Sequence, residues 1–311
     1  MKILVLGAGG TGGYFGGRLA QSGADVTFLV RDKRAAQLAA HGLVIETTKE
    51  RIVLAVKTVL AATVKPEYDV IFLACKAYDL AGSIAAILPA MHATTQVVPL
   101  LNGMSHLDDL DIAFGRERVM GGSCQIAAML TPDGVVKNLA EPHAILWGAR
   151  FGNTKQIELA AALAIEFAKT PVDWRVSDHV IQDMWEKLVF LSTLAGMTCL
   201  MRGSIGEILA TGDGKTHTQR YLDSCIAVAI KEGFPPRPAI MDRFQAVMTS
   251  VGSSLTASML RDLEAGNEVE ADHIVGYMLE KARLYQLDDT LLSIAYAHLQ
   301  TYQNRRKAKR L

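Results

Sequence analysis

The chain has 311 residues, half of them hydrophobic, which is enough for a sizeable core and about two domains. Basic and acidic side chains both number 32, so the formal net charge is zero. This balance argues against nucleic acid as a partner, because proteins that bind nucleic acid usually carry a basic excess. The basic run at Arg305–Arg310 is expected to be a solvated terminus.

Neither membrane insertion nor export is indicated. No segment reaches the roughly 18 continuous apolar residues of a membrane span, and the stretch from Gly7 to Gly17 is too rich in glycine for a signal peptide. Four cysteines are scattered without CxxC spacing: Cys75, Cys124, Cys199 and Cys225. We therefore expect a soluble cytoplasmic protein with reduced thiols, no disulfide framework and no metal site.

The chain opens with a βαβ unit. A strand is expected at Lys2–Leu6, a helix at Thr11–Ser22 and a second strand at Asp25–Val30. Glycines stand between the first strand and the helix, and Gly23 ends the helix. This order within roughly 30 residues is typical of a nucleotide-binding fold.

Further strands and helices alternate as far as residue 176. Strands are expected at Leu43–Thr47, Arg51–Val56, Tyr68–Cys75, Gln96–Leu101, Arg118–Gly121, Val135–Leu139 and Val172–Val176, and helices at Asp32–His41 and Glu158–Lys169. The run YDVIFLAC is apolar nearly throughout, as in a parallel strand buried on both faces. Residues 1–176 are therefore predicted to form an α/β, doubly wound, Rossmann-type domain that binds a dinucleotide.

The pattern becomes helical after residue 176. Helices are expected at Asp178–Thr198, His217–Lys231, Pro238–Ser250, Asp272–Leu284 and Asp289–Gln303. Breakers rich in glycine and proline, such as GFPPRP at Gly233–Pro238, separate them. Residues 177–311 are therefore predicted to form an all-helical domain that supplies substrate-binding and catalytic residues.

Gly7, Gly9 and Gly12 form the pattern GxGxxG between the first strand and the first helix. Gly7 permits the tight turn, Gly9 lets the backbone approach a pyrophosphate, and Gly12 lets the helix pack closely on the strand. The pyrophosphate would meet the free amides at the helix N-terminus. This context favours a dinucleotide site over a glycine-rich turn without a ligand.

Arg31 follows the second strand, 19 residues after Gly12. NAD sites usually carry Asp or Glu about 20 residues after the motif, where the carboxylate binds the ribose 2′-hydroxyl. A guanidinium at this place suits the 2′-phosphate of NADP instead. We therefore expect NADP(H) as the cofactor, although Asp32 directly afterwards leaves NAD open.

Two polar residues follow predicted strands: Lys76 after VIFLAC and Asn102 after VVPLL. In open α/β sheets, ligands bind outside the carboxyl ends of the strands. Both residues are therefore candidates for binding cofactor or substrate. An ordinary loop position would explain either of them separately.

Lys187 stands in a strongly apolar helix, DMWEKLVFLSTLAGMT. A snorkelling side chain is one interpretation. The other is a functional lysine, because desolvation lowers the pKa of an ammonium group and makes it a better proton donor near neutral pH. Ser258 and Glu270 flank the turn Gly266-Asn267, and a role at the start of a helix explains Glu270 equally well.

Together these segments resemble the ketopantoate reductase (2-dehydropantoate 2-reductase) family. The matching pieces include MKILVLGAGGTGGYFGGRLA, LACKAYDL, LLNGM, WEKLVF and SSLTASMLRDLEAGNEVEADHIVG. The resemblance implies that Lys187 donates a proton and that Glu270 orients the lysine or a substrate hydroxyl. It implies that Lys76 and Asn102 help to bind cofactor and substrate, and that Ser258 contacts the substrate. The implied reaction is NADPH-dependent reduction of 2-dehydropantoate to pantoate, in pantothenate biosynthesis.

One pair of positions departs from the family, which usually has asparagines four and eight residues after the lysine. Here these positions are Leu191 and Ala195, on the same helical face as Lys187. A site that loses hydrogen-bonding groups binds a polar substrate less well. The apolar pair is therefore expected to weaken the binding of ketopantoate and to admit a less polar or larger 2-keto acid, while 2-dehydropantoate stays the first expected substrate.

Two other functions are compatible with the sequence. One is another NADP(H)-linked hydroxyacid or opine-type dehydrogenase, against which Ser258, Glu270 and the CKAYDL segment argue. The other is a non-catalytic NADPH-sensing protein, which would not need Lys187 and Asn102 together with a carboxylate. The expected partner is a small keto acid, and the apolar C-terminal helices leave a homodimer open.

Overall fold

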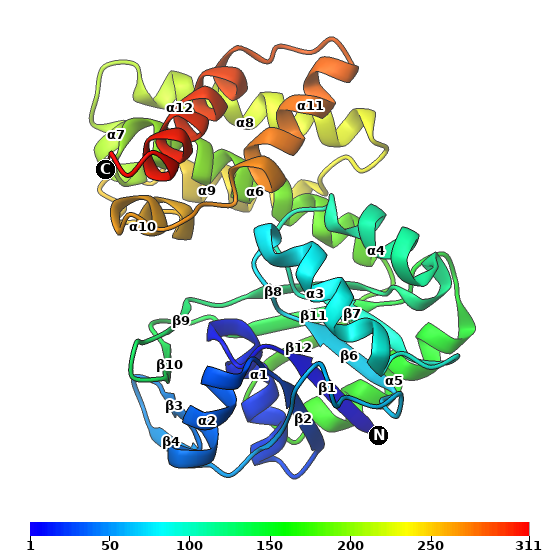
Figure 1. Ribbon diagram of the computed structural model, residues 1–311. Helices are drawn as coiled ribbons and strands as arrows, with labels where there is room; N and C mark the ends of the chain where they lie inside the picture. The colour runs from blue at the N-terminus through cyan, green and yellow to red at the C-terminus, as the bar shows by residue number, and fades with distance from the viewer. Residues whose placement is uncertain (311) are drawn as a thin grey trace. The chain divides into compact units, whose positions relative to one another are not determined.

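The computed structural model describes residues 1–310, which form two compact units. The first unit comprises Met1–Leu101 and His106–Ile181, and the second comprises Asn102–Ser105 and the chain from Gln182 onward. Figure 1 shows that the first unit contains strands and helices, whereas the second is built from helices. The predicted fold class, a Rossmann-type domain followed by a helical domain, is confirmed.

A parallel sheet with the strand order β5-β2-β1-β6-β7 forms the centre of the first unit. Its strands are β1 (Lys2–Leu6), β2 (Asp25–Leu29), β5 (Lys57–Val59), β6 (Val70–Leu73) and β7 (Gln96–Pro99). In the register of the sheet, Val5 of β1 pairs with Phe28 on one side and with Phe72 on the other. The strand order reverses between β1 and β6, which is the point where doubly wound sheets bind nucleotides.

Helices and two smaller sheets complete this unit. The helices are α1 (Gly10–Gln21), α2 (Asp32–His41), α3 (Leu80–Ile87), α4 (His106–Phe114) and α5 (Thr154–Phe167), with 3₁₀ turns η1 (Ala77–Asp79), η2 (Leu88–Ala90) and η3 (Arg116–Arg118). One small sheet has the order β4-β3-β10-β9, and the other has the order β12-β11-β8. Their strands are β3 (Leu43–Glu46), β4 (Arg51–Leu54), β8 (Gly121–Gln125), β9 (Ala128–Leu130), β10 (Val135–Asn138), β11 (Ala144–Gly148) and β12 (Asp173–Val176).

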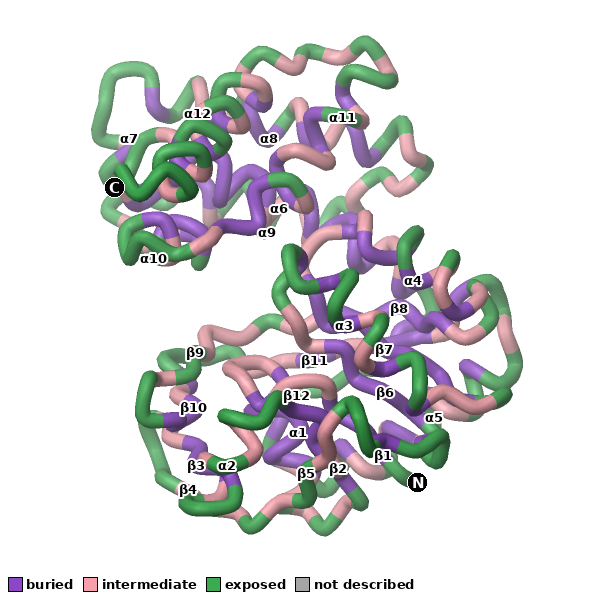
Figure 2. Tube along the Cα trace, in the orientation of Figure 1, coloured by how far each residue is buried: buried purple, intermediate pink, exposed green. Residues whose placement is uncertain are grey.

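The core of the first unit lies on both sides of the parallel sheet. Strands β6 and β7 are buried along their whole length, as Figure 2 shows. Helix α1 packs very closely, because a Cβ on Gly16 would lie 2.8 Å from the Phe28 ring and one on Gly17 would lie 2.5 Å from Ile45. Burial of a side chain such as Phe28 contributes roughly 1.5–3 kcal/mol. The glycines of α1 thus bring the start of the helix into a fixed place on the sheet.

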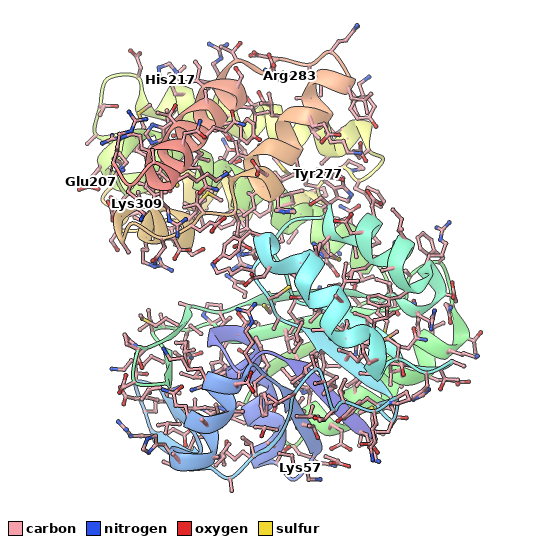
Figure 3. The ribbon with its side chains drawn as sticks, in the orientation of Figure 1. Lys57, Glu207, His217, Tyr277, Arg283 and Lys309 are labelled. Atoms are coloured by element: carbon pink, nitrogen blue, oxygen red, sulfur yellow. The ribbon has the colours of Figure 1, made fainter. Side chains whose placement is uncertain are left out.

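The second unit is organised around α6 (Val180–Met201), which belongs to it from Gln182 onward. The other helices are α7 (Ile205–Leu209), α8 (Gly214–Lys231), α9 (Pro238–Met248), α10 (Ser258–Glu264), the π-helical turn η4 (Asp272–Gly276), α11 (Tyr277–Leu284) and α12 (Thr290–Lys307). Trp185 of α6 stacks with Phe234, and its ring centroid lies 6.1 Å from that of Tyr277, which Figure 3 labels on α11. Within residues 1–310, every helix is too short or too polar to span a lipid bilayer.

The strand expected at residues 118–121 starts later in the structure. Residues 116–118 form the 3₁₀ turn η3, Val119 makes an isolated parallel bridge to Val97, and the strand β8 begins at Gly121. Gly115, with φ of +84°, turns the chain at this point, and Arg118 Nε closes the turn by donating to Phe114 O at 2.6 Å. The sequence pattern also missed the strands β5, β9 and β11 and the helices α3, α4 and α7.

Candidate active site

The turn between β1 and α1 has the geometry of a phosphate-binding loop. Gly7 has φ of +87°, a conformation that side chains disfavour, and its N–H donates to Leu29 O at 2.9 Å. A Cβ on Gly12 would lie 2.3 Å from Gly7 O, so this helix packing requires glycine. A Cβ on Gly9 would meet no protein atom within 4 Å, so the space beside the start of α1 is open. The loop therefore fits a pyrophosphate, which the amides and dipole of α1 attract.

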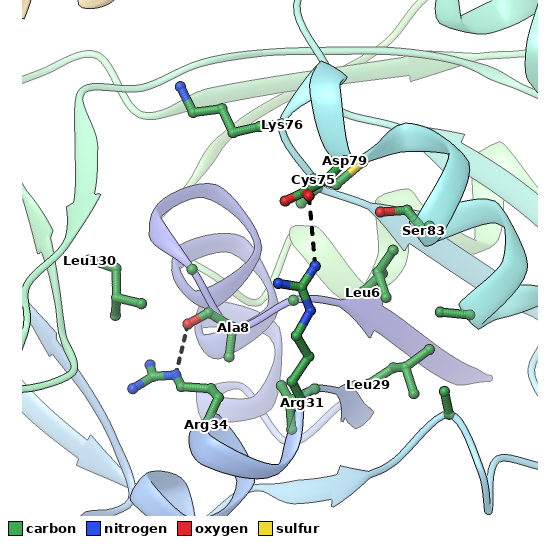
Figure 4. A pocket seen from close by; sticks show the side chains of 17 residues that line it. Leu6, Ala8, Leu29, Arg31, Arg34, Cys75, Lys76, Asp79, Ser83 and Leu130 are labelled. Atoms are coloured by element: carbon green, nitrogen blue, oxygen red, sulfur yellow. Dashed lines mark hydrogen bonds and ion pairs between the residues drawn. The ribbon is translucent and has the colours of Figure 1, made fainter. Parts of the chain in front are cut away.

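A cavity of about 350 Å³ adjoins this loop (Figure 4). Its polar and charged lining residues are Arg31, Arg34, Cys75, Lys76, Asp79 and Ser83, and Gly7, Gly9, Leu29, Val30 and Leu130 are among the others. The cavity lies outside the carboxyl ends of β1, β2 and β6, at the switch point of the sheet. Its position and volume fit part of a dinucleotide cofactor.

The basic residues of the cavity include two that the sequence predicted. Arg31 is the N-cap residue of α2, its side chain is 87% exposed, and its Nη2 lies 3.7 Å from Asp79 Oδ1. Such an exposed, long ion pair is weak, so Asp79 leaves the guanidinium able to bind an anion. Lys76 follows β6, whereas Asp32 is not among the lining residues. At the end of β2 the cavity thus presents the guanidinium of Arg31 and not the carboxylate of Asp32, which fits a 2′-phosphate.

Sequence reasoning missed Arg34, which also lines the cavity. Its Nε donates to Ala8 O at 3.1 Å, and its Nη1 donates to Gly134 O at 3.0 Å and to Gln37 Oε1 at 2.6 Å. Burial lowers the pKa of Arg34 from its ordinary value. The sequence did offer a signal for Arg34. It follows Arg31 by three residues, about one helical turn, so both side chains project from the start of the same helix.

In the second unit, Lys187 lies on α6 between fully buried neighbours. Lys187 itself is half-buried, while Leu188 and Val189 are 1% and 0% exposed. Farther along the helix, Leu191 is half-buried and Ala195 is buried. The lysine therefore stands in a mainly apolar helix, and apolar side chains follow it at the i+4 and i+8 positions.

Two acidic residues of α6 bind a single arginine just before this lysine. Asp183 and Glu186 are buried, and both accept hydrogen bonds from Arg237 Nη2. Arg237 Nε and its backbone N–H also donate to Glu186 Oε1, at 2.8 and 2.9 Å. Glu186 and then Asp183 raise the pKa of Arg237 above its ordinary value. This cluster fixes the segment before α9 to the first turns of α6.

Ser258 is held near α6 through its neighbour. It is the exposed first residue of α10, and the preceding residue, Ala257, is the N-cap. The Ala257 N–H donates to Thr198 Oγ1 of α6 at 3.4 Å, and that hydroxyl donates to Leu194 O at 2.7 Å. The start of α10 is therefore attached directly to the helix that carries Lys187.

Asn102 belongs to the helical unit, although it follows β7 in the sequence. The next residue, Gly103, has φ of +92°, and a Cβ on it would lie 2.6 Å from His273 O. Ser105 Oγ shares a 2.9 Å hydrogen bond with His273 Nδ1. Glu270 is buried, 8% exposed, and lies just before the π-helical turn that contains His273. One residue, His273, thus links the loop of Asn102 to the turn that follows Glu270.

The candidate residues fall into two sets. Of the residues predicted to bind the cofactor, Gly7, Gly9, Gly12, Arg31 and Lys76 belong to the α/β unit. Asn102, which is predicted to bind cofactor and substrate, belongs to the helical unit with Lys187, Ser258 and Glu270. The first set can hold a phosphorylated dinucleotide. The second combines an amine, a carboxylate and two hydrogen-bonding groups, which suits proton transfer to a polar substrate.

Comparison with known proteins gives the same picture. Models of "Ketopantoate reductase PanE/ApbA" and of its C-terminal domain match residues 3–151 and 179–303. The chain is 38% identical over 303 residues to the uncharacterized oxidoreductase YkpB of Bacillus subtilis, covering 97% of this chain and 99% of that protein. It is 29% identical over 302 residues to the 2-dehydropantoate 2-reductase of Pyrococcus abyssi, covering 93% of each.

A solved structure extends the comparison to another activity. The structure of D-mandelate dehydrogenase with NADH and anilino(oxo)acetate has a TM-score of 0.87, 22% identity and coverage of 99% of this chain and 100% of that chain. At this identity, the likeness shows a shared fold. The two family models and the curated relatives go further, since they span both units with high coverage. The chain therefore belongs to the ketopantoate reductase family, and it is an oxidoreductase that uses NADPH and acts on CH–OH donors.

Proposed function

We propose that the protein reduces a 2-keto acid to a 2-hydroxy acid and that Lys187 is the proton donor. The observation that carries the proposal is the place of Lys187: it is half-buried on α6, with fully buried residues beside it. An amine in such a place can meet a bound substrate while the buried residues around it keep its position fixed. A proton donor to a ketone is the function that fits the family.

The α/β unit holds the cofactor in this proposal. The glycine loop and the N-terminus of α1 bind the pyrophosphate, and Arg31 binds the 2′-phosphate. Lys76, which lines the same cavity, contributes a second positive charge. When bound, NADPH supplies the hydride that the ketone carbon receives.

The helical unit supplies the proton and binds the substrate. Lys187 gives its proton to the ketone oxygen as that oxygen becomes a hydroxyl, and the remaining neutral amine is reprotonated from solvent. Before the transfer, the ammonium charge stabilises the negative charge that develops on the oxygen. Glu270 orients the lysine or a substrate hydroxyl. Asn102 and Ser258 offer hydrogen bonds to the polar groups of the substrate.

The first substrate candidate is 2-dehydropantoate, which gives pantoate. It follows from the family and from the curated relative in Pyrococcus abyssi. A second candidate is a 2-keto acid with an apolar side chain. Leu191 and Ala195 favour it, because they leave the helix face after Lys187 without amide groups. The fold shared with D-mandelate dehydrogenase, whose product of oxidation is phenylglyoxylate, is compatible with this candidate.

The deciding experiment follows NADPH oxidation with 2-dehydropantoate, phenylglyoxylate and a panel of aliphatic 2-keto acids. Lys187→Ala is compared with Lys231→Ala, which alters an exposed lysine of α8. We expect turnover of at least one acid by the wild type and by Lys231→Ala, with a loss of about 100-fold or more in Lys187→Ala. Equal turnover by the wild type and Lys187→Ala would refute the role of the lysine. The preferred acid distinguishes the two substrate candidates.

A further inference from the structure

Arg34 is a basic residue that lines the cofactor cavity, and the proposed reaction assigns it no role. It lies in the first turn of α2, three residues after Arg31, and both side chains line the cavity. Figure 4 shows that the two guanidinium groups point in different directions, Arg31 toward Asp79 and Arg34 toward Ala8 of the glycine loop. The difference in direction indicates a difference in task.

The guanidinium of Arg34 joins three segments of the α/β unit. Nε donates to Ala8 O in the glycine loop, at 3.1 Å. Nη1 donates to Gly134 O in the turn between β9 and β10, at 3.0 Å, and to Gln37 Oε1 farther along α2, at 2.6 Å. Because the guanidinium is planar and rigid, these bonds fix the glycine loop relative to the β9–β10 turn.

The segments that Arg34 joins are packed without spare room. Gly134 has φ of +90°, and a Cβ on it would lie 2.2 Å from Gln37 Nε2. A Cβ on Gly10, the first residue of α1, would lie 2.9 Å from the backbone oxygen of Ala128, the first residue of β9. The β9–β10 hairpin therefore contacts the first turn of α1 and the side chain of α2 that supports Arg34. Leu130 of this hairpin lines the cofactor cavity.

The charge of Arg34 remains uncompensated by these bonds. All three oxygens that it binds are uncharged, namely two backbone carbonyls and one amide. Its Nη2 is buried and has no hydrogen-bond partner among the described residues. A guanidinium stays protonated even when burial lowers its pKa, so a positive charge is held directly beneath the loop. That charge favours an anion at the loop at any usual pH.

We propose that Arg34 is a positioning residue that holds the glycine loop and the β9–β10 hairpin in the shape that receives the cofactor pyrophosphate. Arg31 binds the 2′-phosphate, which NADPH carries and NADH lacks. Arg34 affects the binding of the pyrophosphate, which NADPH and NADH share. The inference rests on nicotinamide cofactor use and is independent of the keto acid and of Lys187.

The test measures nucleotide binding without any keto acid, so it does not depend on turnover. NADPH and NADH are titrated, by the fluorescence of the reduced nicotinamide, against the wild type, Arg34→Met, Arg34→Lys and Arg31→Met. Lys33→Met is the matched control, since Lys33 is an exposed residue between the two arginines. Melting temperatures and hydrogen–deuterium exchange of the loop at residues 7–12 are recorded for each variant.

We expect Arg34→Met to weaken NADPH and NADH by a similar factor, about tenfold, and to speed amide exchange in the loop. Arg34→Lys loses most of the same affinity, because an ammonium cannot reproduce the planar fork. Arg31→Met lowers the affinity for NADPH alone, and Lys33→Met changes neither affinity.

A loss of affinity confined to NADPH in Arg34→Met would make Arg34 a 2′-phosphate ligand. A lower melting temperature with unchanged affinities would make it a packing residue. Either result overturns the proposal. Nucleotide binding that follows the expected pattern in a protein that reduces no keto acid would refute the proposed function and leave this inference standing.

Discussion

Ser105 and His273 are joined by a 2.9 Å hydrogen bond across 168 positions of the sequence. The bond fixes the segment Asn102–Ser105 within the helical unit, at the π-helical turn that follows Glu270. Gly103 makes this close approach feasible, because any larger residue would collide with the His273 carbonyl. The position of Asn102 is therefore set by helical residues and not by the strand that precedes it.

Loss of this bond is expected to affect substrate binding more than stability. In Ser105→Ala we expect KM for the preferred keto acid to rise about fivefold, because a hydrogen bond of roughly 1 kcal/mol no longer orders the loop of Asn102. Ser254→Ala, at an exposed position, is the control. Steady-state kinetics of both variants provide the measurement. An unchanged KM in Ser105→Ala would separate this loop from the substrate site.

The apolar face of α6 is expected to set the substrate preference. In Leu191→Asn we expect the ratio of kcat/KM for 2-dehydropantoate to that for phenylglyoxylate to rise about tenfold, because an amide is restored one helical turn after Lys187. Leu191 is half-buried, so the polar side chain is tolerated more easily there than at the buried Ala195. Leu200→Asn, farther along the same helix, controls for a general effect. A constant ratio would show that this face does not contact the substrate.

Arg237 is expected to stabilise the helical unit through Asp183 and Glu186. Its removal in Arg237→Met leaves two buried carboxylates without their shared cation, and we expect a loss of about 2 kcal/mol in the free energy of unfolding. Arg237→Lys should recover only part, because lysine cannot bind both carboxylates with a planar fork. Urea unfolding measures both, with Arg243→Met, an exposed arginine of α9, as the control. Equal stability of wild type and Arg237→Met would contradict the expectation.

The buried thiols predict a loss of stability in alkali. Burial raises the pKa of Cys199 and of Cys225 from 9.0 to about 12. Above pH 9 the unfolded chain releases these protons while the folded chain keeps them, so the free energy of unfolding falls as pH rises from about 9 to about 12. Each thiol contributes up to about 1.4 kcal/mol per pH unit. Urea unfolding at several pH values measures the slope, which Cys225→Ala should reduce and Cys124→Ala should not.

Local patterns were sufficient for most of the fold. The βαβ unit and the parallel sheet could be predicted from local patterns. The apolar runs around Val5 and Phe72 indicate buried parallel strands, and the glycines of α1 indicate a tight turn followed by a closely packed helix. The strands β5 and β9 have only three residues each, and pairing with neighbouring strands stabilises them. Sequence patterns cannot detect such pairing. The strand expected at residues 118–121 begins later for a related reason, since the turn that follows Gly115 extends to Arg118 and β8 starts at Gly121.

The candidate site was predictable wherever its residues belong to a local motif. Gly7, Gly9, Gly12 and Arg31 follow from the pattern around the first helix. The task of Arg34 depends on Gly134, 100 positions away, and no local pattern reports such a partner. Four expectations stay predictions: the catalytic roles of the site residues, the domain boundary at residue 176, the cytoplasmic location and the homodimer.

The inclusion of Asn102–Ser105 in the helical unit constrains how such proteins can be recombined. A fragment that begins at Gln182 would lack the tetrapeptide that His273 holds. A chimera that takes its C-terminal half from a relative would pair a foreign His273 with a native Ser105. Exchange of substrate preference by recombination therefore needs three crossovers, one on each side of this tetrapeptide and one near residue 181. A single crossover would separate Asn102 from the helices that place it.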